Sequence, residues 1–191
     1  MITVDCGDEL SGLTARCVVR FRLFSACAGD GVGPFGMTIG ITAFLADSAE
    51  AVNGKLYVLG AGWDMLVVSQ VPAVQQRVAV GVLVQVGWND SEVEHDVTLR
   101  LETEDGDPVP LARHAAGMPP GTAVAAIGHR FTTGRGTLVR AGDAQTHPVT
   151  FTINDLLLDR VGGYSWVIEV DGAIMHRLPM RVVRQAPGGA A

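Results

Sequence analysis

The sequence is short of the features that mark several common protein classes. It has three cysteines, Cys6, Cys17 and Cys27, all near the start of its 191 residues and without a Cys-x-x-C pair. An odd number of cysteines at these spacings fits neither a disulfide framework nor a zinc site. No apolar run approaches the roughly 18–20 residues that a membrane-spanning helix needs. We therefore expect no membrane partner and no structural metal.

Positive charge is also scarce. Lys55 is the only lysine, and the formal net charge is -6. Nucleic-acid-binding proteins usually carry a clustered basic face, so we expect no nucleic-acid partner. The acidic Asp5 and Asp8 stand where a secretory signal carries positive charge, and Arg20 and Arg22 interrupt the apolar segment that it needs. We predict a cytoplasmic protein.

What the sequence does contain is apolar alternation of period 2, which is typical of half-buried strands. The clearest example is RVAVGVLVQVGW at 77–88, because a helix would spread its β-branched valines around the cylinder. Further strands are predicted at 39–46 and 55–63, and a weaker one at 124–131. The predicted inward-facing residues are Val78, Val80, Val82, Val84, Val86 and Trp88; Val97, Leu99 and Leu101; Val149, Phe151 and Ile153; Tyr164, Trp166, Ile168 and Val170; and Ile174, Leu178, Met180 and Val182.

Turn-forming pairs separate these strands, and helical patterns are missing. Asn53-Gly54, Asp105-Gly106 and Asp171-Gly172 tolerate positive φ, and the last stands directly between two strands. One short helical turn is predicted at 110–117. We predict an all-β fold, a two-sheet antiparallel sandwich of the immunoglobulin or fibronectin type with about 7–8 strands.

Tyr164 follows LLLDRVGG and begins a predicted strand. This arrangement is similar to the tyrosine corner of sandwich domains, in which the hydroxyl bonds to the backbone a few residues upstream. The alternative is an aromatic residue at a strand start with no such bond.

Two short motifs match binding signatures in letters only. GVGPFG at 31–36 has the glycine spacing of a dinucleotide-binding loop, but a strand-like segment follows it in place of the required helix. The acidic ETEDGD, with Glu102, Glu104, Asp105 and Asp107, lacks the spacing of a calcium loop. We interpret it as a solvated hairpin tip.

The histidines show no local metal or catalytic motif. No G-x-S-x-G elbow marks a nucleophile, and Ser165 lies inside a predicted strand. We assign no catalytic, cofactor-binding or metal-ligating residue and no cofactor. His176 is expected on the apolar face of its strand. The histidines are dispersed along the chain at His95, His114, His129, His147 and His176.

Three segments together carry a family resemblance: FLADSAEAVNGKLYVLGAGWD at 44–64, DVTLRLETEDG at 96–106 and GGYSWVIEVDG at 162–172. Over about residues 39–183 the chain resembles an uncharacterised bacterial family of small β-rich proteins. The resemblance implies a sandwich domain and no known activity, catalytic residue or cofactor.

The first of these segments is predicted to be the first hairpin of the sandwich. Asn53-Gly54 turns the chain, and Gly60 and Gly62 allow close backbone approach. Asp47 and Lys55 are expected to lie near one another around the connecting loop.

The domain organisation expected from these patterns has three parts. Residues 1–36 are an N-terminal extension, disordered or the product of a start assigned too early, since Met37 precedes the family-like region. The alternative is a genuine strand, because RCVVRFRLF also alternates. Residues 37–184 form the sandwich domain, and 185–191 a disordered tail.

For function, we favour a non-enzymatic binding or assembly module with a protein partner, since sandwiches recognise partners through end loops or strand edges. The alternative is a small hydrolase or metal-dependent enzyme, with a site assembled from dispersed His and Asp/Glu residues. The sequence makes no prediction of oligomeric state.

Overall fold

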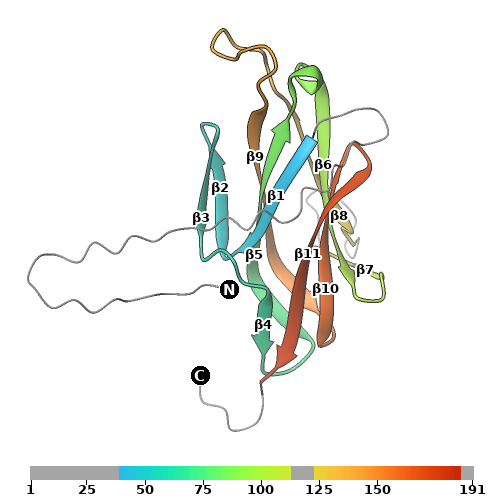
Figure 1. Ribbon diagram of the computed structural model, residues 1–191. Helices are drawn as coiled ribbons and strands as arrows, with labels where there is room; N and C mark the ends of the chain where they lie inside the picture. The colour runs from blue at the N-terminus through green and yellow to red at the C-terminus, as the bar shows by residue number, and fades with distance from the viewer. Residues whose placement is uncertain (1–38, 113–122, 186–191) are drawn as a thin grey trace, which may run out of the picture. The chain divides into compact units, whose positions relative to one another are not determined.

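The computed structural model describes residues 39–112 and 123–185, which form an all-β fold as predicted (Figure 1). The described part includes one 3-10 helical turn, η1 (Trp88–Asp90), and no helix long and apolar enough to span a membrane. Eleven strands lie in the described residues, more than the number predicted. They are β1 (Ile39–Ala46), β2 (Ser48–Val52), β3 (Lys55–Leu59), β4 (Met65–Val68), β5 (Ala73–Val86), β6 (Glu94–Thr103), β7 (Pro108–Val109), β8 (Ala126–Thr132), β9 (Gln145–Leu158), β10 (Gly162–Val170) and β11 (Ala173–Arg184).

Several predictions fall outside the described residues. They are the boundary at Met37 and the extension before it, the three cysteines, the GVGPFG motif and His114. Most of the helical turn at 110–117 and of the tail at 185–191 lies outside as well.

The strands form three sheets. One has the order β1-β5-β9; a larger one has the order β4-β11-β10-β6-β7, with β8 also paired to β6; and β2 and β3 form a separate two-stranded sheet. The larger sheet is curled. The prediction of antiparallel pairing throughout is wrong, because β4 runs parallel to β11. The extra sheet arises because, among the described strands, β2 and β3 pair only with each other.

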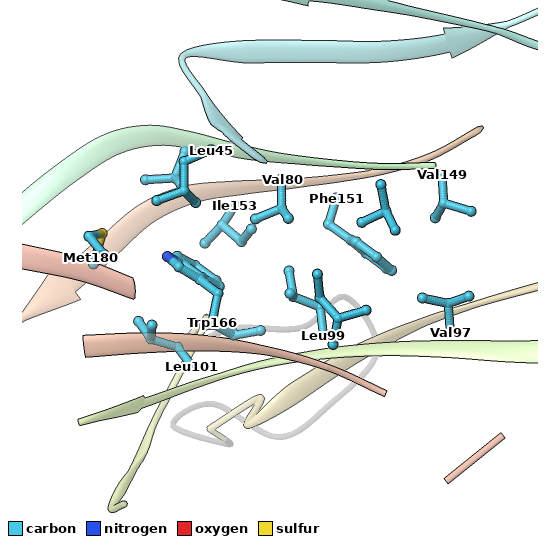
Figure 2. Packing of buried hydrophobic residues seen from close by; sticks show 14 of the residues in the cluster. Leu45, Val80, Val97, Leu99, Leu101, Val149, Phe151, Ile153, Trp166 and Met180 are labelled. Carbon is cyan, nitrogen blue, oxygen red and sulfur yellow. The ribbon is translucent and has the colours of Figure 1, made fainter. Parts of the chain in front are cut away.

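The two larger sheets share one hydrophobic core. Inward residues of β1, β5 and β9 pack against inward residues of β6, β10 and β11, and Figure 2 shows these side chains meeting between the two layers. The five valines predicted to face inward from β5 are all fully buried, and so are Val97, Leu99 and Leu101 of β6. Period-2 alternation therefore identified the main core strands correctly.

Two of the predicted inward residues are placed differently. Trp88 is not in a strand: β5 ends at Val86, and Trp88 begins η1. Ile174 is 50% exposed, because the register of β10 and β11 shifts between Ile168 and Glu169, so that Ile168 pairs with His176 but Glu169 pairs with Ile174. The residue left over at this bulge, Met175, packs against the core instead.

Tyr164 forms the corner bond predicted for it. Its side chain is 4% exposed, and its hydroxyl donates to the carbonyl of Arg160, four residues upstream, at 2.7 Å. Burial raises the pKa of the hydroxyl, more than the bond to Arg160 lowers it. The bond ties the loop that precedes β10 to the strand itself.

We predict that Tyr164→Phe lowers the free energy of unfolding by about 1 kcal/mol, because it removes a net hydrogen bond and leaves the Arg160 carbonyl without that donor. Denaturant melts of the full chain measure the change. Tyr57→Phe is the matched control, since Tyr57 is 56% exposed and its substitution should leave stability unchanged. Equal melts for Tyr164→Phe and the wild type would show that the hydroxyl contributes nothing.

Candidate functional site

Three histidines that are far apart in sequence come together around Phe131. The ring of His95 in β6 lies 5.6 Å from that of Phe131 in β8, centroid to centroid. The ring of His147 in β9 stacks on Phe131 at 4.1 Å with an interplanar angle of 4°. His129, two residues before Phe131, lies 6.1 Å from His147. We call these four residues the histidine cluster.

Strand pairing explains this convergence. In the register of β6 and β8, His95 lies directly opposite Phe131. His147 comes from β9, which belongs to the other large sheet and pairs there with β5. The histidine cluster therefore joins a strand of one sheet to two strands of the other. No spacing along the sequence could have revealed it.

His95 is the most enclosed member of the cluster, at 1% exposed. Its Nδ1 lies 2.8 Å from Oδ2 of Asp171, and its Nε2 lies 2.9 Å from the carbonyl oxygen of Asp90. A carboxylate and a carbonyl only accept hydrogen bonds, so both ring nitrogens must donate, and only the imidazolium has two N–H groups. Burial by itself would lower the pKa of His95, but these two bonds and the charges of Asp171 and Asp90 outweigh it and raise the pKa.

Asp171 reaches His95 from the turn between β10 and β11. The predicted Asp171-Gly172 hairpin is confirmed, with φ of 51° and 80° at its two residues. The second carboxylate oxygen of Asp171 accepts from the backbone N–H of Asp96 at 2.9 Å, and the N–H of Asp171 donates to the carbonyl of Asp96 at 2.9 Å. The turn is thus fastened to β6 by three bonds.

Arg135 bonds to residues on both sides of Asp90, whose carbonyl is the other acceptor of His95. This side chain lies over the ring of Trp88, with 4.6 Å between the guanidinium carbon and the ring centroid, and donates to the Trp88 carbonyl at 2.8 Å. It also donates to the hydroxyl of Ser91 at 3.0 Å and pairs with Glu92 at 3.3 Å. Arg135 therefore fixes η1, and with it the carbonyl of Asp90.

His147 and His176 behave differently from His95. Burial lowers the pKa of His147, and the charge of His129 lowers it further. His176 lies in β11 opposite Ile168, and burial lowers its pKa too. His147 and His176 therefore favour the neutral form in the folded protein, whereas His95 favours the cation.

The geometry of His95 does not suit a hydrolase. Both of its nitrogens are already bonded, so neither is available to take a proton from a nucleophile. The nearby hydroxyl of Ser91 donates to the Trp88 carbonyl at 2.6 Å. Among the described residues no group of three or more His, Cys, Asp or Glu side chains could hold a metal ion.

The acidic segment 102–107 is engaged within the protein. Glu102 pairs with Arg100 and Arg177, and one carboxylate oxygen of Glu104 accepts from the N–H of Gly163 at 3.2 Å. Asp105 and Asp107 both pair with Arg160. β6 and β7 flank the Asp105-Gly106 turn as an antiparallel pair, so the hairpin interpretation is confirmed.

The first hairpin of the chain differs from its prediction. The Asn53-Gly54 turn forms with φ of 51° and 69°, but it joins β2 to β3 outside the two large sheets. Asp47 lies at the base of this hairpin, where its carboxylate fills the space that a side chain at Gly60 would need. Lys55 is at the tip, opposite Val52. The expectation that Asp47 and Lys55 are neighbours is therefore wrong, because Asp47 lies at the base of the hairpin and Lys55 at its tip.

One side of this hairpin packs on the sheet beneath it. Ala49 of β2 is buried against Ala79 of β5, and Val58 of β3 packs beside them. Ala79 is fully buried although it alternates with the core valines, so the hairpin covers the outer face of β5. Small side chains at positions 49 and 79 allow the two layers to approach closely.

The other side of the hairpin is apolar and exposed. Leu59 is 72% exposed, Tyr57 56% and Val52 38%. Alternation and register place them on one side together with Glu50 and Lys55, since Glu50 pairs with Tyr57 and Val52 with Lys55. We call these five residues the hairpin face. Sequence alternation could have identified the face, had the hairpin been recognised as a separate layer.

Comparison with family models shows which family the chain is similar to. A family model described as a family of unknown function, DUF6941, matches residues 41–183. This confirms the predicted resemblance to a family of unknown function, with a match that begins at residue 41 and ends at residue 183 as predicted. None of the curated proteins compared with the chain matches it.

We predict that His147→Phe makes the protein less sensitive to acid. The pKa of His147 is lower in the folded protein than in the unfolded chain, where it is about 6.5. The contribution of His147 to the stability of the fold is therefore complete above about pH 6.5 and is lost as the pH falls through the pKa of the folded protein. Phenylalanine keeps the ring stack on Phe131 and cannot take up a proton. Denaturant melts between about pH 7 and pH 5 should show a smaller loss for His147→Phe than for the wild type.

The matched variant for this experiment is His129→Ser. It leaves the burial of His147 in place, which is the larger cause of the lowered pKa, so most of the acid-side loss should persist. Parallel pH profiles for His147→Phe and the wild type would contradict the role given to His147.

We also predict that the purified protein carries no stoichiometric metal. The cysteines form no Cys-x-x-C pair, and both ring nitrogens of His95 are already hydrogen-bonded. Elemental analysis of protein purified without chelator measures this directly. Zinc, calcium or iron at close to one ion per chain would overturn the prediction.

Proposed function

The chain belongs to DUF6941, a family of unknown function, and we propose that it is a non-enzymatic binding module whose partner is a protein. The observation that carries the proposal is the hairpin face, on which Tyr57 and Leu59 are 56% and 72% exposed side by side. Grouped exposed apolar residues with a polar rim are typical of protein interaction sites, whereas isolated ones are ordinary.

The composition of the hairpin face supports this role. Tyrosine is enriched among residues that dominate binding energy, because its ring buries a large area at a small cost in conformational entropy. Glu50 and Lys55 flank the apolar residues and lie on the same side of the hairpin. Charges of both signs at the rim of a binding site orient the bound partner more than they increase its affinity.

The hairpin is also rigid enough to serve as a preformed site. Its turn has positive φ at Asn53 and Gly54, as a two-residue connection requires. Its base is closed by a bond from the N–H of Asp47 to the carbonyl of Leu59 at 3.1 Å, and its inner side packs through Ala49. A preformed face loses less entropy on binding than a flexible loop does. Among the strands that the structure describes, β3 pairs on one side only, so an extended segment of a partner could add to its other edge.

Two finer features belong to the same proposal. The fold is of the immunoglobulin or fibronectin type, which the Tyr164 corner supports. The protein acts in the cytoplasm and binds neither nucleic acid nor membrane; its net charge of -6 supports the absence of a nucleic-acid partner.

The test is site-specific photo-crosslinking in extracts of the organism that encodes the protein. A photoreactive phenylalanine analogue is placed at position 57 and, as a control, at position 138, since Leu138 is 95% exposed but stands alone in a loop. We expect a protein adduct from position 57 only. Excess wild-type protein should suppress it, and excess Leu59→Ser should not.

The identified partner is then measured against purified variants. Leu59→Ser should weaken binding by about tenfold or more, which corresponds to loss of a contact worth about 1.4 kcal/mol, and Leu138→Ser should bind as the wild type does. Identical adducts from both positions, or unchanged binding by Leu59→Ser, would reject the hairpin face as the binding site.

A further inference from the structure

His95 links three segments that are separate in the chain. It belongs to β6, its Nδ1 bonds to Asp171 in the β10–β11 turn, and its Nε2 bonds to the carbonyl of Asp90 in η1. Both partners accept, so both bonds exist together only while the ring carries two protons. Loss of one proton removes one of the two donors and turns that nitrogen into an acceptor facing another acceptor.

We propose that His95 is a proton-dependent clamp, which holds η1 and the β10–β11 turn against β6 as an imidazolium and releases one of them when the ring becomes neutral. The segment loosened is the β10–β11 turn, which then keeps only its two bonds to the backbone of Asp96. The side chain of Asp171 is 29% exposed and can take its hydrogen bonds from water, whereas the Asp90 carbonyl belongs to a turn that Arg135 holds in place.

The charged groups around the ring favour the closed clamp. Asp171 and Asp90 contribute negative charge from two different elements. On the third side lies Phe131, and beyond it His147, whose lowered pKa keeps it neutral near pH 7. Outside the clamp, the carboxylate of Asp96 pairs with Arg130 at 3.2 Å, so that pair contributes little net charge at His95.

The pH range in which the clamp is closed follows from the direction in which the pKa of His95 is shifted. A histidine whose folded pKa is raised stabilises the fold fully below its unfolded pKa, about 6.5, and this stabilisation is lost as pH rises through the folded value. The clamp is therefore closed at slightly acidic pH and opens on the alkaline side. The stability that His95 contributes is thus lost as the pH rises, whereas that of His147 is lost as the pH falls.

The first test follows the wild-type full chain by NMR. The ring nitrogens of His95 should both carry protons at pH 6 and lose one at a pH above the ordinary histidine range. Over the same interval, hydrogen-exchange protection should fall at the N–H groups of Asp96 and Asp171, corrected for the intrinsic pH dependence of exchange. Protection at Val167, in the middle of β10, should not change. A ring with a single proton at pH 6, or unchanged protection at Asp96 and Asp171, would overturn the proposal.

The second test removes the charge and keeps the turn. Asp171→Asn retains a residue that tolerates the positive φ of 51° at this position, and its oxygen can still accept from Asp96. The pKa of His95 should fall, and the alkaline-side loss of stability should become smaller. Asp105→Asn is the matched control, because Asp105 also precedes a glycine in a turn and pairs with Arg160 instead of a histidine. If Asp171→Asn gave the wild-type profile, His95 would be an ordinary buried histidine and not a clamp.

Discussion

The packing of two β-sheets on each other is the contact on which the rest of the structure depends. It includes the row of fully buried valines along β5, which belongs to the same core as Leu99, Leu101 and Trp166 of the facing sheet (Figure 2). β-branched side chains suit this position because their restricted rotamers cost little entropy in an extended strand. Burial of apolar area at about 25 cal/mol per Å² makes such a row the main favourable term in folding. The turns and side chains outside the core are positioned by strands whose register is fixed by this packing.

The outer faces of the two sheets are protected by different means. Ala79 on the outer face of β5 is covered by the β2–β3 hairpin, which packs there through Ala49. On the other sheet, Val167 of β10 is fully buried although it points away from the core. Its neighbours in register are Arg100 and Arg177, which join Glu102 and Glu169 in one ion-pair network. The stems of these arginines can cover apolar surface while their charged ends stay paired near water. One face is thus closed by a second layer of chain, and the other by long side chains.

The sequence predicts local periodicity well and three-dimensional neighbourhood poorly. The inward residues of β5, β6, β9 and β10 are readable because period 2 is imposed by the strand itself. The bulge at Met175 is not readable, since it is a property of how β11 pairs with β10 and reverses the face of Ile174. The hairpin was read as part of the sandwich because a turn pair shows that two strands meet, and not which sheet they join. The parallel pairing of β4 with β11 connects positions more than a hundred residues apart, which no local pattern contains.

The histidine cluster was missed for the same reason, yet its position follows from the core. His95 precedes Val97, Leu99 and Leu101 on the inward face of β6, and His147 precedes Val149, Phe151 and Ile153 on that of β9. Each strand therefore continues its apolar row with one imidazole at the same end of the core.

An imidazole at such a position can be neutral or protonated, because histidine is the one side chain whose ordinary pKa lies near neutrality. Where two acceptors meet it, as at His95, the cation is the form that satisfies them. Where it stacks on Phe131 beside another histidine, as at His147, the neutral ring avoids a buried unpaired charge. The partners of the two imidazoles thus shift their pKa values in opposite directions, upward at His95 and downward at His147, although both lie at the same end of the core.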